Sequence, residues 1–185
     1  MKIITGAYSG RNFYMPYGIR PTQNMLRKAV IDIIGHDLKG VCALELFSGS
    51  GAVGMEMLSC GASEVTFVEH NQKNAKTIEE NLVMLRPGEH GQKVDVINQD
   101  AFATVKRFAR ENRKFHVVFF DPPYGLKLAK KTLKTLMTHD ILHASSFVVA
   151  QYDVGERLPD PTEALSIIKD KTYGATRLTV FQKAA

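Results

Sequence analysis

A chain of 185 residues is long enough to bury one sizeable hydrophobic core and too short for two, so a single domain is expected. With 44% hydrophobic and 23% charged residues, the composition is that of a globular protein and excludes general disorder. The formal net charge of +5 is compatible with a polyanionic partner but does not identify one.

Membrane insertion and metal binding are not indicated. No stretch approaches the roughly 20 consecutive apolar residues of a membrane span. Residues 1–12 contain no apolar segment of signal-peptide length, so we expect a cytoplasmic protein. Cys42 and Cys60 lack C-x-x-C spacing and the six histidines are scattered, which favours two reduced thiols and no metal site.

Residues 1–40 are expected to form an extension that packs on the main domain, residues 41–185. The stretch TGAYSGRNF is punctuated by glycines and predicts a β-hairpin. The following RPTQNMLRKAVIDII predicts a helix with Leu26, Ala29, Val30 and Ile33 facing the core.

From Val41 onward, short apolar runs alternate with helical patterns, as is typical of a mostly parallel α/β sheet covered on both faces. Strands that are buried on both faces need nearly continuous apolar residues. Five runs meet this requirement: 42–47, 64–69, 94–98, 115–120 and 146–152. The C-terminal LSIIKDKTYGATRLTVFQK contains no helical pattern and predicts an antiparallel hairpin with a turn at Tyr173 and Gly174, closing one edge of the sheet.

A glycine-rich turn follows the first predicted strand. Gly49, Gly51 and Gly54 satisfy G-x-G-x-x-G at a strand-to-helix junction, where glycine lets the backbone turn tightly and approach a ligand. Glu69 ends the second strand, where an acid accepts hydrogen bonds from the hydroxyls of a ribose. These features fit a nicotinamide dinucleotide or S-adenosylmethionine. The C-terminal hairpin favours the latter.

Asp100 follows the third strand and has two interpretations. Its carboxylate is placed to accept a hydrogen bond from the amino group of an adenine. Alternatively, it is the N-cap of the helix that begins near Ala101.

The fourth strand ends in FFDPPYG. Two prolines fix the backbone and remove two N–H donors, so Asp121 and the carbonyl of Pro122 offer acceptors at the ligand-binding edge of the sheet. Such acceptors suit the exocyclic amine of a nucleobase, because they orient its N–H groups and localise a lone pair for attack on a sulfonium methyl group. Tyr124 would stack on the base.

Basic residues gather in two segments. No acid precedes Asp32, whereas Lys2, Arg11, Arg20, Arg27 and Lys28 do. The second segment follows the Pro-Pro motif and contains Lys127, Lys130, Lys131 and Lys134. Both suit phosphate contacts, although a solvated surface explains them as simply.

A resemblance to a known family extends over nearly the whole chain and rests on these stretches: GAYSGRNF, RPT with Arg27, LELFSGSGAVGMEML, FVEHN, VINQDAF, FFDPPY and YGATRLTVF. They resemble the RsmD family. The family comprises S-adenosylmethionine-dependent enzymes that methylate guanine N2 in 16S ribosomal RNA. The resemblance implies a Rossmann-like, class I methyltransferase fold with a seven-stranded sheet. It places the target amine at Asp121, Pro122, Pro123 and Tyr124. The implied cofactor site comprises Glu45, Ser48, Gly49, Ser50, Gly51, Glu69, Asp100 and Ala101.

The resemblance also implies a ribosomal RNA partner, and the compact size favours RNA shaped within a small-subunit assembly intermediate. Residues 1–40 would then dock the RNA, with Arg11, Arg20 and Arg27 on its phosphates. Met25, Lys28 and Gln151 depart from the family pattern, which often has a Glu near Gln151.

Other functions remain open from the residues alone. These are methylation of adenine N6 or another amino group in RNA or DNA, methylation of a protein glutamine, a nicotinamide-dependent oxidoreductase and a noncatalytic RNA-binding module.

Overall fold

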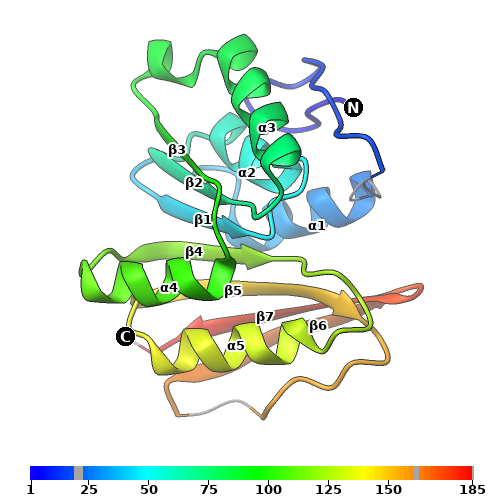
Figure 1. The fold of residues 1–185 in the computed structure, drawn as a ribbon, viewed down its shortest axis with the longest axis vertical. Coiled ribbons are helices and arrows are strands. Elements are labelled where there is room, and N and C mark those ends of the chain that lie inside the picture. Colours follow the sequence, from blue (N-terminus) through cyan, green and yellow to red (C-terminus); the bar gives the residue numbers. More distant parts are fainter. Residues whose placement is uncertain (19–22, 161–162, 185) are drawn as a thin grey trace.

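The computed structural model describes residues 1–18, 23–160 and 163–184. Its centre is one seven-stranded sheet with the strand order β3-β2-β1-β4-β5-β7-β6 (Figure 1). Pairing is parallel from β3 to β5 and antiparallel between β5, β7 and β6. The strands are β1 (Cys42–Leu46), β2 (Glu64–Val68), β3 (Lys93–Ile97), β4 (Phe115–Phe120), β5 (Leu142–Asp153), β6 (Leu165–Tyr173) and β7 (Thr176–Lys183).

Helices cover both faces of this sheet, which confirms the predicted Rossmann-like α/β fold (Figure 1). On one face, α1, α2 and α3 pack on alternate residues such as Ala43, Val65 and Phe67. On the other, α4 and α5 pack on the intervening residues, among them Leu44 and Phe120. The helices are α1 (Asn24–Ile34), α2 (Ala52–Ser59), α3 (Gln72–Leu85), the short 3₁₀ helix η1 (Pro87–His90), α4 (Ala101–Arg110) and α5 (Leu128–Thr138).

The predicted C-terminal hairpin is confirmed, and it forms the β6 edge of the sheet. Tyr173 pairs with Thr176, so Gly174 and Ala175 make the two-residue turn, and Gly174 adopts a φ of 61°. The turn is thus one residue later than the sequence indicates. Strand β5 also starts earlier, at Leu142, because an irregularity in its pairing with β4 extends the ladder.

The N-terminal segment folds back on itself, although only Lys2 and Asn12 form a β-bridge. The amide of Ile3 donates to the carbonyl of Arg11 at 3.0 Å, and that of Phe13 donates to the carbonyl of Met1 at 2.9 Å. Tyr8 packs with Ile3 and Phe13 in the same hydrophobic cluster as α1, α2 and α3. This segment is therefore part of the main body.

The structure corrects the prediction that Arg27 contacts RNA phosphates. The Arg27 side chain is fully buried, and its Nη1 lies 2.7 Å from Glu56 Oε1 on α2. Its Nη2 donates to the carbonyl of Lys2 and to Asn24 Oδ1. Because the guanidinium is enclosed by these partners, Arg27 has a structural role.

Candidate active site

A cavity of about 480 Å³ lies at the edge of the sheet where the parallel strands end. It receives residues from the loops after β1, β2 and β4, from the end of β5 and from the start of β7. The lining residues are Gly18, Gln23, Leu26, Glu45, Phe47, Ser48, Gly49, Ser50, Glu69, His70, Asn74, Phe119, Asp121, Pro122, Pro123, Tyr124, Gln151 and Thr176. This is the edge at which open α/β sheets bind ligands.

The glycine-rich turn is stabilised by a buried serine. Ser48 Oγ donates to the carbonyl of Glu45 at 2.7 Å and accepts the amide of Val68 at 3.0 Å, which joins the turn to the end of β2. Gly49 and Gly51 have φ angles of 54° and 71°, in the left-handed region that glycine adopts without strain. The turn is thus fixed in a conformation that directs the chain into α2.

Gly54, the third glycine of the motif, allows close packing of α2 on the sheet. A Cβ at this position would lie 2.3 Å from Phe67 Cε1 and 2.6 Å from Glu45 Oε2. Without a side chain, the Gly54 amide donates to Glu45 Oε2 at 2.8 Å. Burial raises the pKa of Glu45 to about 8, although backbone donors oppose the shift. Glu45 is therefore mostly neutral at pH 7.

Glu69 extends its carboxylate across the turn. Its Oε2 accepts the amide of Gly49 at 2.8 Å, and its Oε1 accepts the amide of Asn71 at 2.8 Å. These donors hold an acceptor at the cavity wall. Oε1 also lies 3.4 Å from Asn74 Nδ2 and 3.3 Å from His70 Nδ1. Oε2, which accepts the Gly49 amide, is therefore the oxygen with an acceptor position left for a ligand hydroxyl.

The Pro-Pro motif enters the cavity directly after β4. Phe120 pairs with Ala150, so the next residues, Asp121 and Gln151, meet at the strand ends. Gln151 Nε2 donates to Asp121 Oδ2 at 2.6 Å. Tyr124 is linked to β7, because its hydroxyl lies 3.0 Å from Thr176 Oγ1. Both side chains of the motif are thus positioned by strands on the C-terminal half of the sheet.

Most of the residues predicted to bind the cofactor or the target amine line this cavity, but three do not. Gly51 is the N-cap of α2. Asp100 is the N-cap of α4, because its Oδ1 accepts the amide of Ala103 at 2.8 Å. Ala101 is the first residue of that helix. The capping interpretation of Asp100 is observed, and contact of Asp100 and Ala101 with an adenine stays a prediction.

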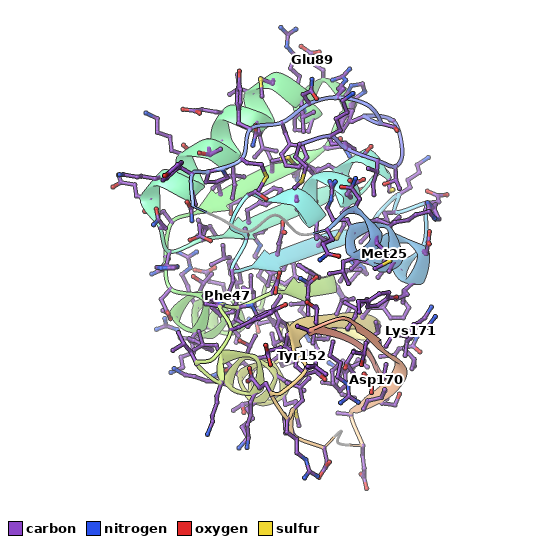
Figure 2. The ribbon with its side chains drawn as sticks, turned by 90° about the vertical axis from the view of Figure 1, so that its right-hand side faces the viewer. Met25, Phe47, Glu89, Tyr152, Asp170 and Lys171 are labelled. Atoms are coloured by element: carbon purple, nitrogen blue, oxygen red, sulfur yellow. The ribbon has the colours of Figure 1, made fainter. Side chains whose placement is uncertain are left out.

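Several lining residues were not anticipated from the sequence. Gln23 is the N-cap of α1 and Leu26 lies on that helix. Phe47 precedes the turn with a φ of 56°. Phe47, labelled in Figure 2, packs edge-on against Phe102 of α4 with ring centroids 5.9 Å apart. Thr176 becomes predictable only once the antiparallel pairing of β7 is known, because that pairing brings the start of β7 to this edge.

The basic residues fall into different environments. Arg11 is exposed, although its guanidinium lies over the Tyr8 ring and donates to the carbonyl of Leu85. Arg20 lies outside the described residues. Met25, on α1, is exposed (Figure 2). The four lysines of the second basic segment line a shallow groove on α5 together with Thr135, Thr138 and His139.

Neither a membrane span nor a metal cluster occurs in the part of the chain that the structure describes. None of its helices combines the length and apolarity needed to cross a bilayer. No three His, Cys, Asp or Glu side chains within residues 1–18, 23–160 and 163–184 are grouped to hold a metal ion.

The chain is similar to known proteins over almost its whole length. A family model described as conserved hypothetical protein 95 matches residues 1–182. YlbH of Bacillus subtilis is 31% identical over 99% of both chains. The ribosomal RNA small subunit methyltransferase D of Haemophilus influenzae is 28% identical over 98% of this chain and 93% of its own. The crystal structure of HI0767 from Haemophilus influenzae superposes with a TM-score of 0.83 at 26% identity, covering 100% of this chain and 98% of the other. The chain therefore belongs to the RsmD family of S-adenosylmethionine-dependent methyltransferases.

Proposed function

We propose that the protein transfers a methyl group from S-adenosylmethionine to the exocyclic N2 of a guanine in 16S ribosomal RNA. One observation carries the proposal: the glycine-rich turn with Glu69 and the acceptor pair of Asp121 and Pro122 line a single cavity. The choice of ribosomal RNA is supported by relatives named ribosomal RNA small subunit methyltransferase D. The choice of guanine N2 rests on the family resemblance.

The residues present fit the cofactor. Glu69 offers a held acceptor for ribose hydroxyls, and the turn from Ser48 to Ser50 presents backbone at the cavity wall. When bound, S-adenosylmethionine supplies an activated methyl group on a sulfonium. Glu45, whose pKa is raised by burial to about 8, adds little negative charge to the same cavity.

The target amine is bound by the Pro-Pro motif. Asp121 and the carbonyl of Pro122 accept its N–H groups and direct the nitrogen lone pair along the transfer axis. Gln151 donates to the Asp121 carboxylate and so holds its orientation before the base enters. Tyr124, fixed by Thr176, offers its ring face to the base, which must leave its helix or loop to reach the cavity.

We further infer that the substrate is RNA within a small-subunit assembly intermediate, docked by residues 1–40. Of the three arginines predicted to contact phosphates, Arg11 is exposed. Arg20 belongs to the same prediction. Adenine or another amino acceptor is the second candidate, because the Pro-Pro motif binds an amine without specifying its ring.

The catalytic prediction is that Asp121→Ala lowers kcat by at least about 100-fold, since an acceptor aligned on the reacting nitrogen is lost. The affinity for S-adenosylhomocysteine should stay within a few fold of the wild type. Radiolabelled methyl transfer to small subunits from cells lacking the protein measures the first quantity, and isothermal titration the second.

Asp37→Ala is the matched control, because Asp37 is exposed and its carboxylate accepts the backbone amide of Lys39, two residues along the chain. It should leave turnover unchanged. Retained turnover in Asp121→Ala would remove Asp121 from the mechanism.

Nucleoside mass spectrometry of the same reactions identifies the product. N2-methylguanosine is expected with the wild type, whereas N6-methyladenosine would replace the proposed base with the second candidate. S-adenosylhomocysteine binding without methylation of any small-subunit particle would contradict the proposed RNA substrate.

A further inference from the structure

Gln151 is a cavity residue whose amide orientation is determined by its neighbour. Its side chain lies on β5, is 3% exposed and lines the cavity beside the Pro-Pro motif. Gln151 Nε2 lies 2.6 Å from Asp121 Oδ2. An ionised carboxylate only accepts hydrogen bonds, so the amide nitrogen must face Asp121 and the amide oxygen must face away from it.

That oxygen, Gln151 Oε1, is buried and has no hydrogen-bond partner among the described residues. Buried amide oxygens are almost always paired, because leaving one unpaired costs free energy. Gln151 is a wall residue of the ligand cavity, so a donor on a bound ligand is the natural source of the missing hydrogen bond. Since the oxygen is covered, side chains at the wall must shift when the donor arrives, and rotamer changes of this kind are common on binding.

The arrangement sets two acceptors next to each other: the Asp121 carboxylate and Gln151 Oε1, which are joined through the amide of Gln151. Among the nucleobases, guanine carries two neighbouring donors, N1–H and the N2 amino group. Adenine and cytosine have a ring acceptor, N1 or N3, beside their amino group. An acceptor next to that ring nitrogen would repel these two bases.

We propose that Gln151 is a specificity-determining residue whose Oε1 accepts the N1–H of the target guanine while Asp121 accepts the N2 amino group. This inference rests on the proposed function, because it assumes transfer to guanine N2. It explains how a motif suited to any exocyclic amine selects one base. Gln151 contacts the base but takes no part in methyl transfer.

The test combines a variant with a base analogue. Small subunits are reconstituted around 16S RNA that carries either guanine or 2-aminopurine at the position mapped by mass spectrometry. 2-Aminopurine keeps the 2-amino group and lacks the N1–H donor. With the wild type, we expect kcat/KM on 2-aminopurine to be about 10- to 100-fold below that on guanine.

Gln151→Leu removes both polar groups and keeps a similar volume. We expect its kcat/KM on guanine to be about 10- to 100-fold below that of the wild type. Its kcat/KM on 2-aminopurine should be no lower than on guanine, because the N1–H donor and the Gln151 Oε1 acceptor belong to one hydrogen bond. Its affinity for S-adenosylhomocysteine and its thermal midpoint should match those of the wild type. Gln182→Leu, at the far end of β7, is the matched control and should behave as the wild type on both substrates.

Equal wild-type rates on guanine and 2-aminopurine would overturn the inference, even if Gln151→Leu failed to fold. The inference would also be overturned if the effects of Gln151→Leu and of 2-aminopurine on kcat/KM were independent, so that their fold-losses multiplied. A loss of S-adenosylhomocysteine affinity in Gln151→Leu as large as its loss of kcat/KM would overturn it too, because Gln151 Oε1 would then contact the cofactor. Failure of the proposed function is distinct, because the wild type would then produce no N2-methylguanosine.

Discussion

At the scale of single residues, the cavity contains acids in contrasting environments. Glu69 accepts the backbone amides of Gly49 and Asn71. Glu45 receives the Gly54 amide, yet burial dominates and raises its pKa to about 8. Hydrogen bonds from the backbone therefore do not fully offset the loss of solvent around Glu45. This imbalance makes the stability of the protein depend on pH.

We expect Glu45 to make the protein less stable as pH rises from about 4.5 to about 8. In that window, folded Glu45 is protonated and unfolded Glu45 is not, so folding takes up a proton. The free energy of unfolding should fall by at most about 1.4 kcal/mol per pH unit from this group, and become level above pH 8. Urea titrations of the wild type and Glu45→Gln at pH 5 to 9 measure the difference in slope.

In this comparison Glu45→Gln keeps an acceptor for Gly54 but removes the titration. Glu79→Gln changes an exposed acid on α3 and should retain the wild-type slope. Identical slopes for the wild type and Glu45→Gln would show that Glu45 is ionised in the folded protein.

At the scale of elements, the packing of α2 on β1 and β2 depends on the absence of a side chain at Gly54. We expect Gly54→Ala to destabilise the protein by about 2 to 4 kcal/mol, since the added methyl group overlaps the Phe67 ring and the Glu45 carboxylate. The loss should outweigh the roughly 1 kcal/mol by which alanine favours a helix over glycine. Chemical denaturation measures the stability, and titration with S-adenosylhomocysteine measures the effect on the turn.

Gly88→Ala is a suitable control for this prediction. Gly88 lies in η1, and an added Cβ there meets no atom within 4 Å. A loss in Gly54→Ala no larger than that in Gly88→Ala would mean that α2 adjusts without strain.

The elements were largely predictable because their signals are local. Strands β1, β2 and β4 are nearly continuous apolar runs, and the glycine spacing and the proline pair mark the two turns that form the site. Strand β3, at the edge of the sheet, alternates polar and apolar residues and is partly exposed. Contacts between distant segments carried no such signal. Gln151 meets Asp121 only through the register of β4 and β5, and Thr176 reaches the cavity only because β7 runs antiparallel.

Arg27 illustrates the same limit. It precedes Val30, Ile31 and Ile34 by three, four and seven residues, so helical spacing alone places it on the buried face of α1. A basic residue on such a face needs a buried partner. That partner, Glu56, is 29 positions away, and nothing in the sequence pairs the two.

At the scale of the whole molecule, Glu56 joins three segments into one body. Its carboxylate accepts the amides of Ile4 and Thr5 and the Thr5 hydroxyl, in addition to the ion pair with Arg27. Glu56 lies on α2, which begins at the glycine-rich turn, and Leu26 beside Arg27 lines the cavity. The N-terminal segment, α1 and the cavity wall should therefore keep or lose their structure together.

We expect Arg27→Leu to destabilise the whole protein by about 3 to 5 kcal/mol, because it leaves the Glu56 carboxylate buried without its counter-charge. Lys28→Leu is the control, since its ion pair with Asp32 is exposed and worth at most about 1 kcal/mol. Urea unfolding followed by circular dichroism and by protease cleavage within residues 1–17 should report one coincident transition in each variant. Cleavage of that segment at a urea concentration below the unfolding transition of the rest of the protein would contradict the single-body description.

The salt dependence of RNA binding by Arg27→Leu should equal that of the wild type, because no phosphate contact is lost. It is measured under conditions in which the variant is folded.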